Sequence, residues 1–456
     1  MSVPGTAPAI GAGEGGALFR AAWRWHFYAG LIVLPVLLWL AATGALYLYK
    51  PEIERAFYGG WSWAAPQGEP RPLAALIPAV ERQSGGRVTN VARPAGPAES
   101  WRMALAMPDG SRRLAFIDPY RGVLLGTAAG GGLMATIRDL HSLAITGPVG
   151  NALVEIVAGW AIVLVVTGVI LWWPRGGSPA VGVRGRPRSR LFWRDLHGSA
   201  GVLAAAVILF LAATGMPWTV FAGAGLNDWV KSSGLGRPKS PGPNPWEKAP
   251  AKAAPAESHA GHDHDGGTAS LPWSMQRQPA PASQGGASRA TPDLAVARAQ
   301  WAGLSAPWTL TLPRTADAPY LVSAATVRAQ DAHAVYLDAA DGRILQDARY
   351  GDFGAGARWI EWGIATHQGQ QYGEANRLLM LAGCIAIWVL GITGPVLWWK
   401  RRREGRLRAP PRATRRGMRN MSIAMLALGV LLPLTGLTML AALAGELVLG
   451  RVRGRA

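Results

Sequence analysis

The string Leu40-Ala41-Ala42-Thr43-Gly44 occurs twice in the chain, the second time at residues 211–215. A histidine precedes each string by the same distance, His26 in the first case and His197 in the second, so both features repeat with an offset of 171 residues. Both copies lie in long apolar stretches that carry no acidic or basic residue. An ungapped repeat of this kind indicates that the fold is built from an internal duplication.

A second pair of apolar stretches repeats with an offset of 226 residues, and in both copies a histidine, a Thr-Gly pair and a Trp pair follow in order. The members are His141, Thr167-Gly168 and Trp172-Trp173 in the first copy, and His367, Thr393-Gly394 and Trp398-Trp399 in the second. The loops also repeat: Asp118 to Gly122 corresponds to Asp338 to Gly342, each flanked by strand-forming residues. Each of these segments predicts two strands joined by a turn in which glycine takes a positive φ.

Composition indicates a membrane protein. Of the 456 residues, 50% are hydrophobic and only 16% are charged, which argues against a soluble nucleic-acid-binding protein. Five apolar stretches reach the roughly 20 residues needed to cross a hydrocarbon core. The single cysteine, Cys384, excludes an intramolecular disulfide, a Cys-rich zinc site and an iron–sulfur cluster held by this chain alone.

The net charge of +19 is concentrated in two short connections. Residues 174–195 carry a net charge of +5 and residues 400–419 a net charge of +9, whereas the two long connections are nearly balanced. The positive-inside rule therefore places the short connections and the N-terminus in the cytoplasm, and the long connections and the C-terminus outside it. We expect a multi-pass membrane protein in contact with lipid.

The predicted fold class is a mainly α membrane protein with five transmembrane helices and two small external α+β modules. The expected organisation is a cytoplasmic tail (1–25), first span (26–49), first module (50–135), interfacial helix and second span (136–173), basic loop (174–195), third span (196–226), second module (227–357) with a disordered insertion (234–291), interfacial helix and fourth span (358–399), basic loop (400–419) and fifth span (420–449).

Four histidines occupy equivalent places in the duplicated spans. His26 and His197 lie at the expected cytoplasmic ends, and His141 and His367 at the expected external ends. Two facing imidazoles suit the axial ligation of haem iron between helices. We therefore predict two b-type haems, one held by His26 and His197 and one by His141 and His367. Ordinary interfacial histidines are the alternative interpretation of the same residues.

Three further histidines, His259, His262 and His264, lie in the predicted insertion. Imidazole and carboxylate groups suit a divalent transition metal, but the surrounding Pro/Ala/Gly/Ser-rich composition favours a solvated, disordered segment.

Together, these motifs resemble the PepSY-associated transmembrane family of bacterial inner-membrane proteins. The resemblance rests on Trp25-His26, the Leu-Ala-Ala-Thr-Gly string, Asp139-Leu140-His141, Arg194-Asp195-Leu196-His197 and the paired Asp-to-Gly turns. It implies PepSY-like external modules on the periplasmic side. It also implies haem-bearing reductases that release iron from ferric siderophores, with the four histidines above as ligands.

The leading hypothesis is therefore a haem-dependent oxidoreductase for iron uptake that transfers electrons across the membrane to a ferric siderophore or another ferric chelate. The electron donor would be a quinol or a separate cytoplasmic reductase, because no Gly-x-Gly-x-x-Gly segment follows a predicted strand. Two alternatives remain open. One is a non-catalytic membrane module whose PepSY-like domains bind a peptide or a partner protein, and the other is a metal transporter.

Overall fold

The structure is a computed structural model that describes residues 14–174, 181–236, 271–276, 280–283, 289–315, 317–401, 423, 425 and 427–453. The chain forms two compact units. The first, here called the helical unit, comprises residues 1–42, 146–224 and 379–456. The second, here called the sheet unit, comprises residues 43–145 and 225–378.

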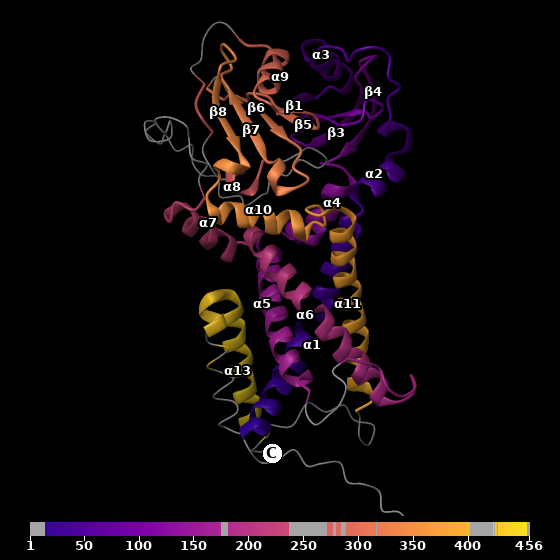
Figure 1. Cartoon of the computed structure of the whole chain (residues 1–456), viewed down its shortest axis with the longest axis vertical. Coiled ribbons are helices and arrows are strands. Elements are labelled where there is room, and N and C mark those ends of the chain that lie inside the picture. The colour runs from indigo at the N-terminus through magenta and orange to yellow at the C-terminus, as the bar shows by residue number, and fades with distance from the viewer. Residues whose placement is uncertain are drawn as a thin grey trace, which may run out of the picture. The chain divides into compact units, whose positions relative to one another are not determined.

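Four helices of the described residues are long and apolar enough to cross a membrane. They are α1 (Glu14–Leu48), α5 (Pro148–Trp172), α6 (Arg190–Gly215) and α11 (Gly373–Trp399). Figure 1 shows them alongside one another. Prolines within α1 and α11 leave these helices continuous, as neighbouring helices in a bundle allow.

The expected fifth span at residues 420–449 is not among these four helices, and part of it lies outside the described residues. Among the described residues the helical conformation is interrupted at Leu432, and α13 (Pro433–Arg453) begins after it, with an apolar part of only Pro433–Gly445. A Cβ atom on Gly436 would lie 2.7 Å from the carbonyl oxygen of Gly429, so the backbone folds back on itself there. Proline at the interruption lacks the N–H that would continue the helix.

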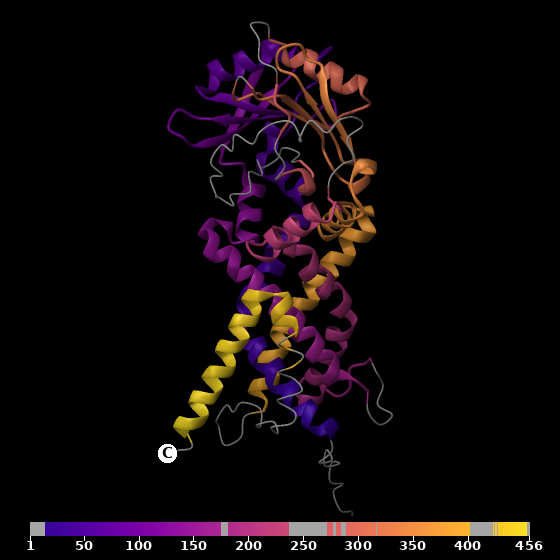
Figure 2. The same cartoon turned by 90° about the vertical axis from the view of Figure 1, so that its left-hand side faces the viewer.

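The helix α13 packs against α5 within the helical unit. Trp160 of α5 donates a hydrogen bond from Nε1 to Thr438 Oγ1 at 2.9 Å. The C-terminal end of α13 lies toward the end of the helical unit where α1 begins (Figure 2).

The third span is shorter than expected. It ends at Trp218 rather than at residue 226, and α7 (Ala222–Ser232) is a separate helix. Thr219 is extended, and the backbone N–H groups of Phe221 and Ala222 donate to the buried carboxylate of Glu155 on α5. These donors would otherwise lack partners at the start of α7, so Glu155 fixes the point where the chain turns.

The sheet unit contains one continuous antiparallel sheet of eight strands rather than two separate modules. The strands are β1 (Arg87–Arg93), β2 (Trp101–Ala106), β3 (Arg112–Asp118), β4 (Val123–Ala129), β5 (Trp308–Thr311), β6 (Tyr320–Ala324), β7 (His333–Leu337) and β8 (Ile344–Arg349). Their order is β4-β3-β2-β1-β5-β6-β7-β8. The two expected modules are therefore halves of one sheet, joined where β1 pairs with β5.

The junction of the two halves follows the internal repeat. Asn90 pairs with Thr311 and Val91 pairs with Leu310. With the 220-residue loop offset, Asn90 corresponds to Leu310 and Val91 to Thr311, so equivalent residues exchange places across the junction. A strand that pairs with its own duplicate in this way buries two edges that would otherwise expose unpaired backbone groups.

Helices cover both faces of the sheet. On one face α3 (Leu73–Ser84) and α9 (Pro292–Trp301) pack over the main hydrophobic core. On the other face α2 (Lys50–Tyr58) and α4 (Leu133–His141) contribute apolar residues to a core with β3. Over the second half, α8 (Trp273–Gln276) and α10 (Ala355–His367) contribute to a core with β7.

The helix α8 corrects part of the predicted disordered insertion at 234–291. Trp273, Ser274 and Met275 are buried. Glu361 of α10 accepts hydrogen bonds from both the backbone N–H and the hydroxyl of Ser274, at 2.8 and 2.9 Å. This segment is held by a buried carboxylate on a distant helix, which a composition-based prediction cannot detect.

The two predicted Asp-to-Gly turns are present. Gly122 and Gly342 donate their backbone N–H groups to the carbonyl oxygens of Asp118 and Asp338, both at 2.9 Å. Both glycines have a positive φ, of 72° and 74°, a region that residues with a Cβ atom seldom occupy.

Asp293 of α9 stabilises the other half of the sheet unit. Its carboxylate accepts hydrogen bonds from the backbone N–H groups of Leu73 and Ala74, at 2.7 and 2.9 Å, at the start of α3. The helix α3 has no cap from its own preceding residue, Pro72. A carboxylate at this position satisfies free donors and complements the helix dipole.

We predict that Asp293→Ala lowers the free energy of unfolding of the sheet unit by about 1–2 kcal/mol, as the loss of a helix cap does elsewhere. The measurement is thermal unfolding of the full-length protein in detergent. Asp228→Ala is the matched control, because Asp228 is exposed on α7. Equal unfolding temperatures for the two variants would contradict the role assigned to Asp293.

Candidate functional site

His26 of α1 and His197 of α6 lie together in the helical unit. Their ring centroids are 6.1 Å apart, and the ring planes are at 87° to one another. The two residues are equivalent in the internal repeat, so the duplication brings the two copies of one histidine face to face. The sequence predicted this pair.

A threonine on a neighbouring helix holds His26. Thr167 Oγ1 of α5 lies 3.0 Å from His26 Nδ1 and 2.6 Å from the carbonyl oxygen of Val163. A carbonyl only accepts, so the threonine hydroxyl donates to Val163 and accepts from His26 Nδ1–H. The other ring nitrogen of His26, Nε2, then carries the lone pair that binds a metal.

The same arrangement holds His197. Thr393 Oγ1 of α11 lies 2.7 Å from His197 Nδ1 and 2.8 Å from the carbonyl oxygen of Val389. A Cβ atom on Gly394 would lie 3.9 Å from His197 Cε1, and one on Gly168 would lie 3.2 Å from His26 Cε1. Within each Thr-Gly pair, threonine binds the imidazole and glycine leaves room for it.

His141 and His367 form the second pair, in the sheet unit. They are the last residues of α4 and α10. Thr43 Oγ1 lies 2.9 Å from His141 Nδ1, so the threonine of the repeated Leu-Ala-Ala-Thr-Gly string holds this histidine. Burial, and secondly the proximity of His141, lower the pKa of His367 from 6.5 to about 3. The structure thus brings His26 and His197 into ring contact and places His141 near enough to His367 to affect its pKa.

The Gln-rich segment after His367 is part of the support of this second pair. Gln371 is buried, accepts a hydrogen bond from the backbone N–H of Ala329 at 2.9 Å and donates one to Gln330 at 2.8 Å. Gly369 takes a φ of 72°, and a Cβ atom there would lie 2.8 Å from Leu48. These contacts end α10 directly after His367.

A cavity of about 1040 Å³ in the helical unit contains His26 and His197 in its wall. Gly168, Gly394 and several tryptophans contribute to the same wall. The basic residues that line it are Arg184, Arg190, Arg194 and Arg401. Asp195 forms salt bridges with Arg184 and Arg194, at 2.7 and 2.9 Å. The cavity is thus apolar along its length and basic where the helix ends meet.

The His26–His197 pair could hold the iron of a haem, because two neighbouring imidazoles in the wall of a largely apolar cavity suit that group. The oriented Nδ1–H groups match the outer hydrogen bonds that fix metal-binding histidines, and the arginines match the carboxylates that a haem carries.

The three other histidines predicted as possible metal ligands lie outside the described residues. The structure therefore does not place the predicted divalent-metal cluster of His259, His262 and His264. Within the described part of the chain, no group of three His, Cys, Asp or Glu side chains is arranged to hold a metal ion. His333 forms a salt bridge with Asp347 on the neighbouring strand, at 2.7 Å.

Four helices that are long and apolar enough to cross a membrane, together with a unit built on an antiparallel sheet, indicate a multi-pass membrane protein. The model of the family described as PepSY-associated TM region matches residues 23–401, and the chain belongs to this family. A comparison with curated proteins finds no match.

The threonine partners are the residues that sequence reasoning missed. Thr43, Thr167 and Thr393 each recur at the equivalent position of the internal repeat. However, Thr-Gly pairs in membrane helices are usually interpreted as helix-packing positions. The signal was the constant distance between each threonine and a histidine in both copies. Which histidine each threonine binds depends on the neighbouring helix, which spacing along one chain does not give.

Glu361 is a buried titratable group on the same helix as His367. It is only 4% exposed, and burial raises the pKa of its carboxyl from 4.5 to about 7. Between these values the folded protein retains a proton that the unfolded chain has released. The free energy of unfolding therefore falls as the pH rises from 4.5 to 7.

We predict that Glu361→Gln removes this pH dependence, which amounts to about 3 kcal/mol for a shift of this size. The measurement is unfolding of the full-length protein by denaturant at pH 5 and pH 7.5. Glu99→Gln, at an exposed position, is the control and should retain the slope of the unmodified protein. An unchanged slope in Glu361→Gln would contradict the assignment.

Proposed function

We propose that this protein is a haem-bearing oxidoreductase of a bacterial inner membrane that passes electrons to ferric chelates, such as ferric siderophores, during iron uptake. The observation that carries the proposal is the His26–His197 pair, with its 6.1 Å centroid separation and two oriented Nδ1 atoms. Membership of the PepSY-associated TM family agrees with it.

The protein's own residues would hold one b-type haem at each histidine pair. His26 and His197 would hold the haem iron in the helical unit, and His141 and His367 would hold it in the sheet unit. Arg184, Arg190, Arg194 and Arg401 would bind the haem carboxylates beside the first pair. Bound haem would supply one-electron chemistry between ferric and ferrous iron.

The threonines keep each imidazole in one orientation and one tautomer. Thr167 and Thr393 each accept from an Nδ1–H group while donating to a carbonyl of their own helix. This leaves Nε2 unprotonated and directed away from the supporting helix. Apolar residues of the cavity wall limit access of water, and burial of that kind affects the potential of a redox centre.

The charge distribution indicates on which side of the membrane the electron donor and the ferric chelate would bind. The basic ends of the transmembrane helices would face the cytoplasm, where a quinol or a separate reductase would supply the electrons. A ferric chelate would be reduced on the side of the sheet unit. Iron would then be released because hard oxygen donors hold Fe(II) less tightly than Fe(III).

The first test of the proposal is the visible spectrum of the purified protein from a haem-replete host. We predict a Soret band, and a haem-to-protein ratio of about two. His26→Ala and His197→Ala should each remove one haem and retain the other. His333→Ala is the matched control, because His333 lies on β7 and is paired with Asp347.

The outcomes separate the candidate functions. A folded protein without a Soret band would refute the haem proposal, and would favour the module that binds a peptide or a partner protein, or the metal transporter. Loss of both haems from one substitution would contradict two independent sites.

The second test concerns the threonine support. We predict that Thr167→Val weakens haem binding by about 10- to 100-fold, as loss of an outer hydrogen bond does for other metal-binding histidines. Titration of the haem-depleted protein with haem measures this. Thr167→Ser retains the hydroxyl and should bind haem nearly as the unmodified protein does. Equal weakening by both substitutions would indicate a packing role for Thr167 instead.

A further inference from the structure

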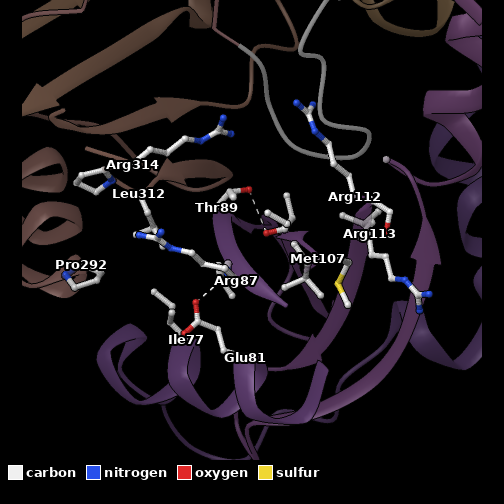
Figure 3. Close-up of a pocket in the computed structure, with 18 of the residues that line it drawn as sticks. Ile77, Glu81, Arg87, Thr89, Met107, Arg112, Arg113, Pro292, Leu312 and Arg314 are labelled. Carbon is white, nitrogen blue, oxygen red and sulfur yellow. Dashed lines mark hydrogen bonds between the residues drawn. The ribbon is translucent and has the colours of Figure 1, made fainter. Parts of the chain in front are cut away.

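A second cavity, of about 910 Å³, lies in the sheet unit and is strongly basic. Figure 3 shows part of its wall. Six arginines line it, against two acidic residues: Arg87, Arg112, Arg113, Arg138, Arg289 and Arg314, with Glu81 and Asp139. The two long connections that form the sheet unit are close to electrically balanced, so this concentration of one charge is local.

The strand register places two of these arginines on one face of the sheet, two strands apart. Arg87 on β1 pairs with Ala106 on β2, and Ala106 pairs with Arg112 on β3. On the other side of β1, the backbone N–H of Leu312 donates to the carbonyl of Thr89 at 2.9 Å, and Arg314 lies on the same side of the cavity as Arg87 (Figure 3). Like charges that line one cavity repel one another unless something compensates them.

The two acidic residues that line the cavity do not neutralise the charge of all six arginines. Asp139 pairs with Arg138 at 3.0 Å, and Glu81 accepts a hydrogen bond from the backbone N–H of Val88 at 2.9 Å. Within the described ranges, no carboxylate forms a salt bridge with Arg87, Arg289 or Arg314. The cavity therefore presents positive charge to whatever occupies it.

Three of these arginines have no charged counterpart in the internal repeat. With the 220-residue loop offset, Arg87 corresponds to Pro307, Arg112 to Ala332 and Arg314 to Pro94. These three arginines are thus departures from the repeat and not by-products of duplication.

The cavity is connected to the second histidine pair through one helix. Ala135, Arg138 and Asp139 of α4 line the cavity, and α4 ends at His141. Six residues of helix separate Ala135 from His141, which corresponds to about 9 Å along the axis. A ligand in the cavity would lie a short distance from the residues that we assign to the second haem.

We infer that this cavity binds the ferric chelate and selects chelates of net negative charge. The inference rests on the proposed function and specifies its substrate class. Carboxylate and catecholate groups that surround Fe(III) leave negatively charged oxygens at the surface of the complex. Arginine donates to such oxygens in pairs, and the cavity volume is within the range of small-molecule sites, roughly 300–1,000 Å³.

The test measures binding to the full-length protein without any reductant, so that it is independent of electron transfer. The probe is ferric citrate, followed by calorimetry in detergent at low salt. We expect Arg87→Glu/Arg314→Glu to weaken binding at least tenfold, and raised salt to weaken binding to the unmodified protein. Arg298→Glu, on the exposed side of α9 and outside the cavity wall, is the charge-matched control.

Three further measurements make the result decisive. A neutral ferric trihydroxamate should bind equally to the double variant and the unmodified protein, or to neither. Iron-free citrate should bind more weakly than ferric citrate; equal binding would overturn the inference in favour of a simple carboxylate site. An unchanged Soret band in the double variant shows that it is folded.

Failure of this inference is distinguishable from failure of the proposed function. Unchanged affinity for ferric citrate in a double variant with normal haem content would overturn the cavity assignment alone. Charge-dependent binding by a protein that holds no haem would support the cavity as a chelate site and refute the reductase. Stronger competition by anionic lipid vesicles than by iron-free citrate would assign the arginines to lipid headgroups and overturn the inference.

Discussion

The hydrogen bond between a threonine hydroxyl and the Nδ1 atom of a histidine is the interaction on which the candidate site depends. It occurs at His26, His197 and His141, each time between residues far apart in the chain. For Thr167 and Thr393, the hydroxyl proton is already donated to a carbonyl one helical turn earlier. The imidazole must then donate, and its second nitrogen is left as the acceptor. A helix-packing contact thus determines which atom of the histidine is available for chemistry.

The internal duplication explains why the histidines meet in pairs. A duplicated helix pair that associates about a twofold axis brings equivalent residues together at that axis. The sheet unit obeys the same relation, because β1 pairs with its own duplicate β5 in a register that exchanges equivalent residues. Departures from the repeat are therefore informative. Glu155, whose carboxylate accepts hydrogen bonds where the chain turns after the third span, has no acidic counterpart at residue 381. Similarly, Arg87, Arg112 and Arg314 have no basic counterparts at the equivalent positions of the repeat.

The sequence was sufficient for features that depend on local pattern or on the repeat itself. It predicted four of the membrane-spanning segments, the turns at Gly122 and Gly342, and the proximity of His26 and His197. It was insufficient where the outcome depends on contacts between distant residues. An apolar composition, for example, does not reveal that Gly429 and Gly436 pack backbone to backbone. The single sheet was missed because an open edge strand and a joined one have the same residue pattern.

The two cavities differ in how far acidic side chains neutralise their positive charge. Near His26 and His197, arginines lie where helix ends meet, and Asp195 pairs with two of them, so the positive charge is largely used within the protein and at the membrane surface. In the sheet unit, Arg87 and Arg314 line one cavity, and within the described residues no carboxylate forms a salt bridge with either of them. Like charges in one cavity repel one another, and a bound anion would reduce that repulsion. On the proposals made above, the first cavity would hold a resident haem, and the second an anionic ligand that binds and dissociates.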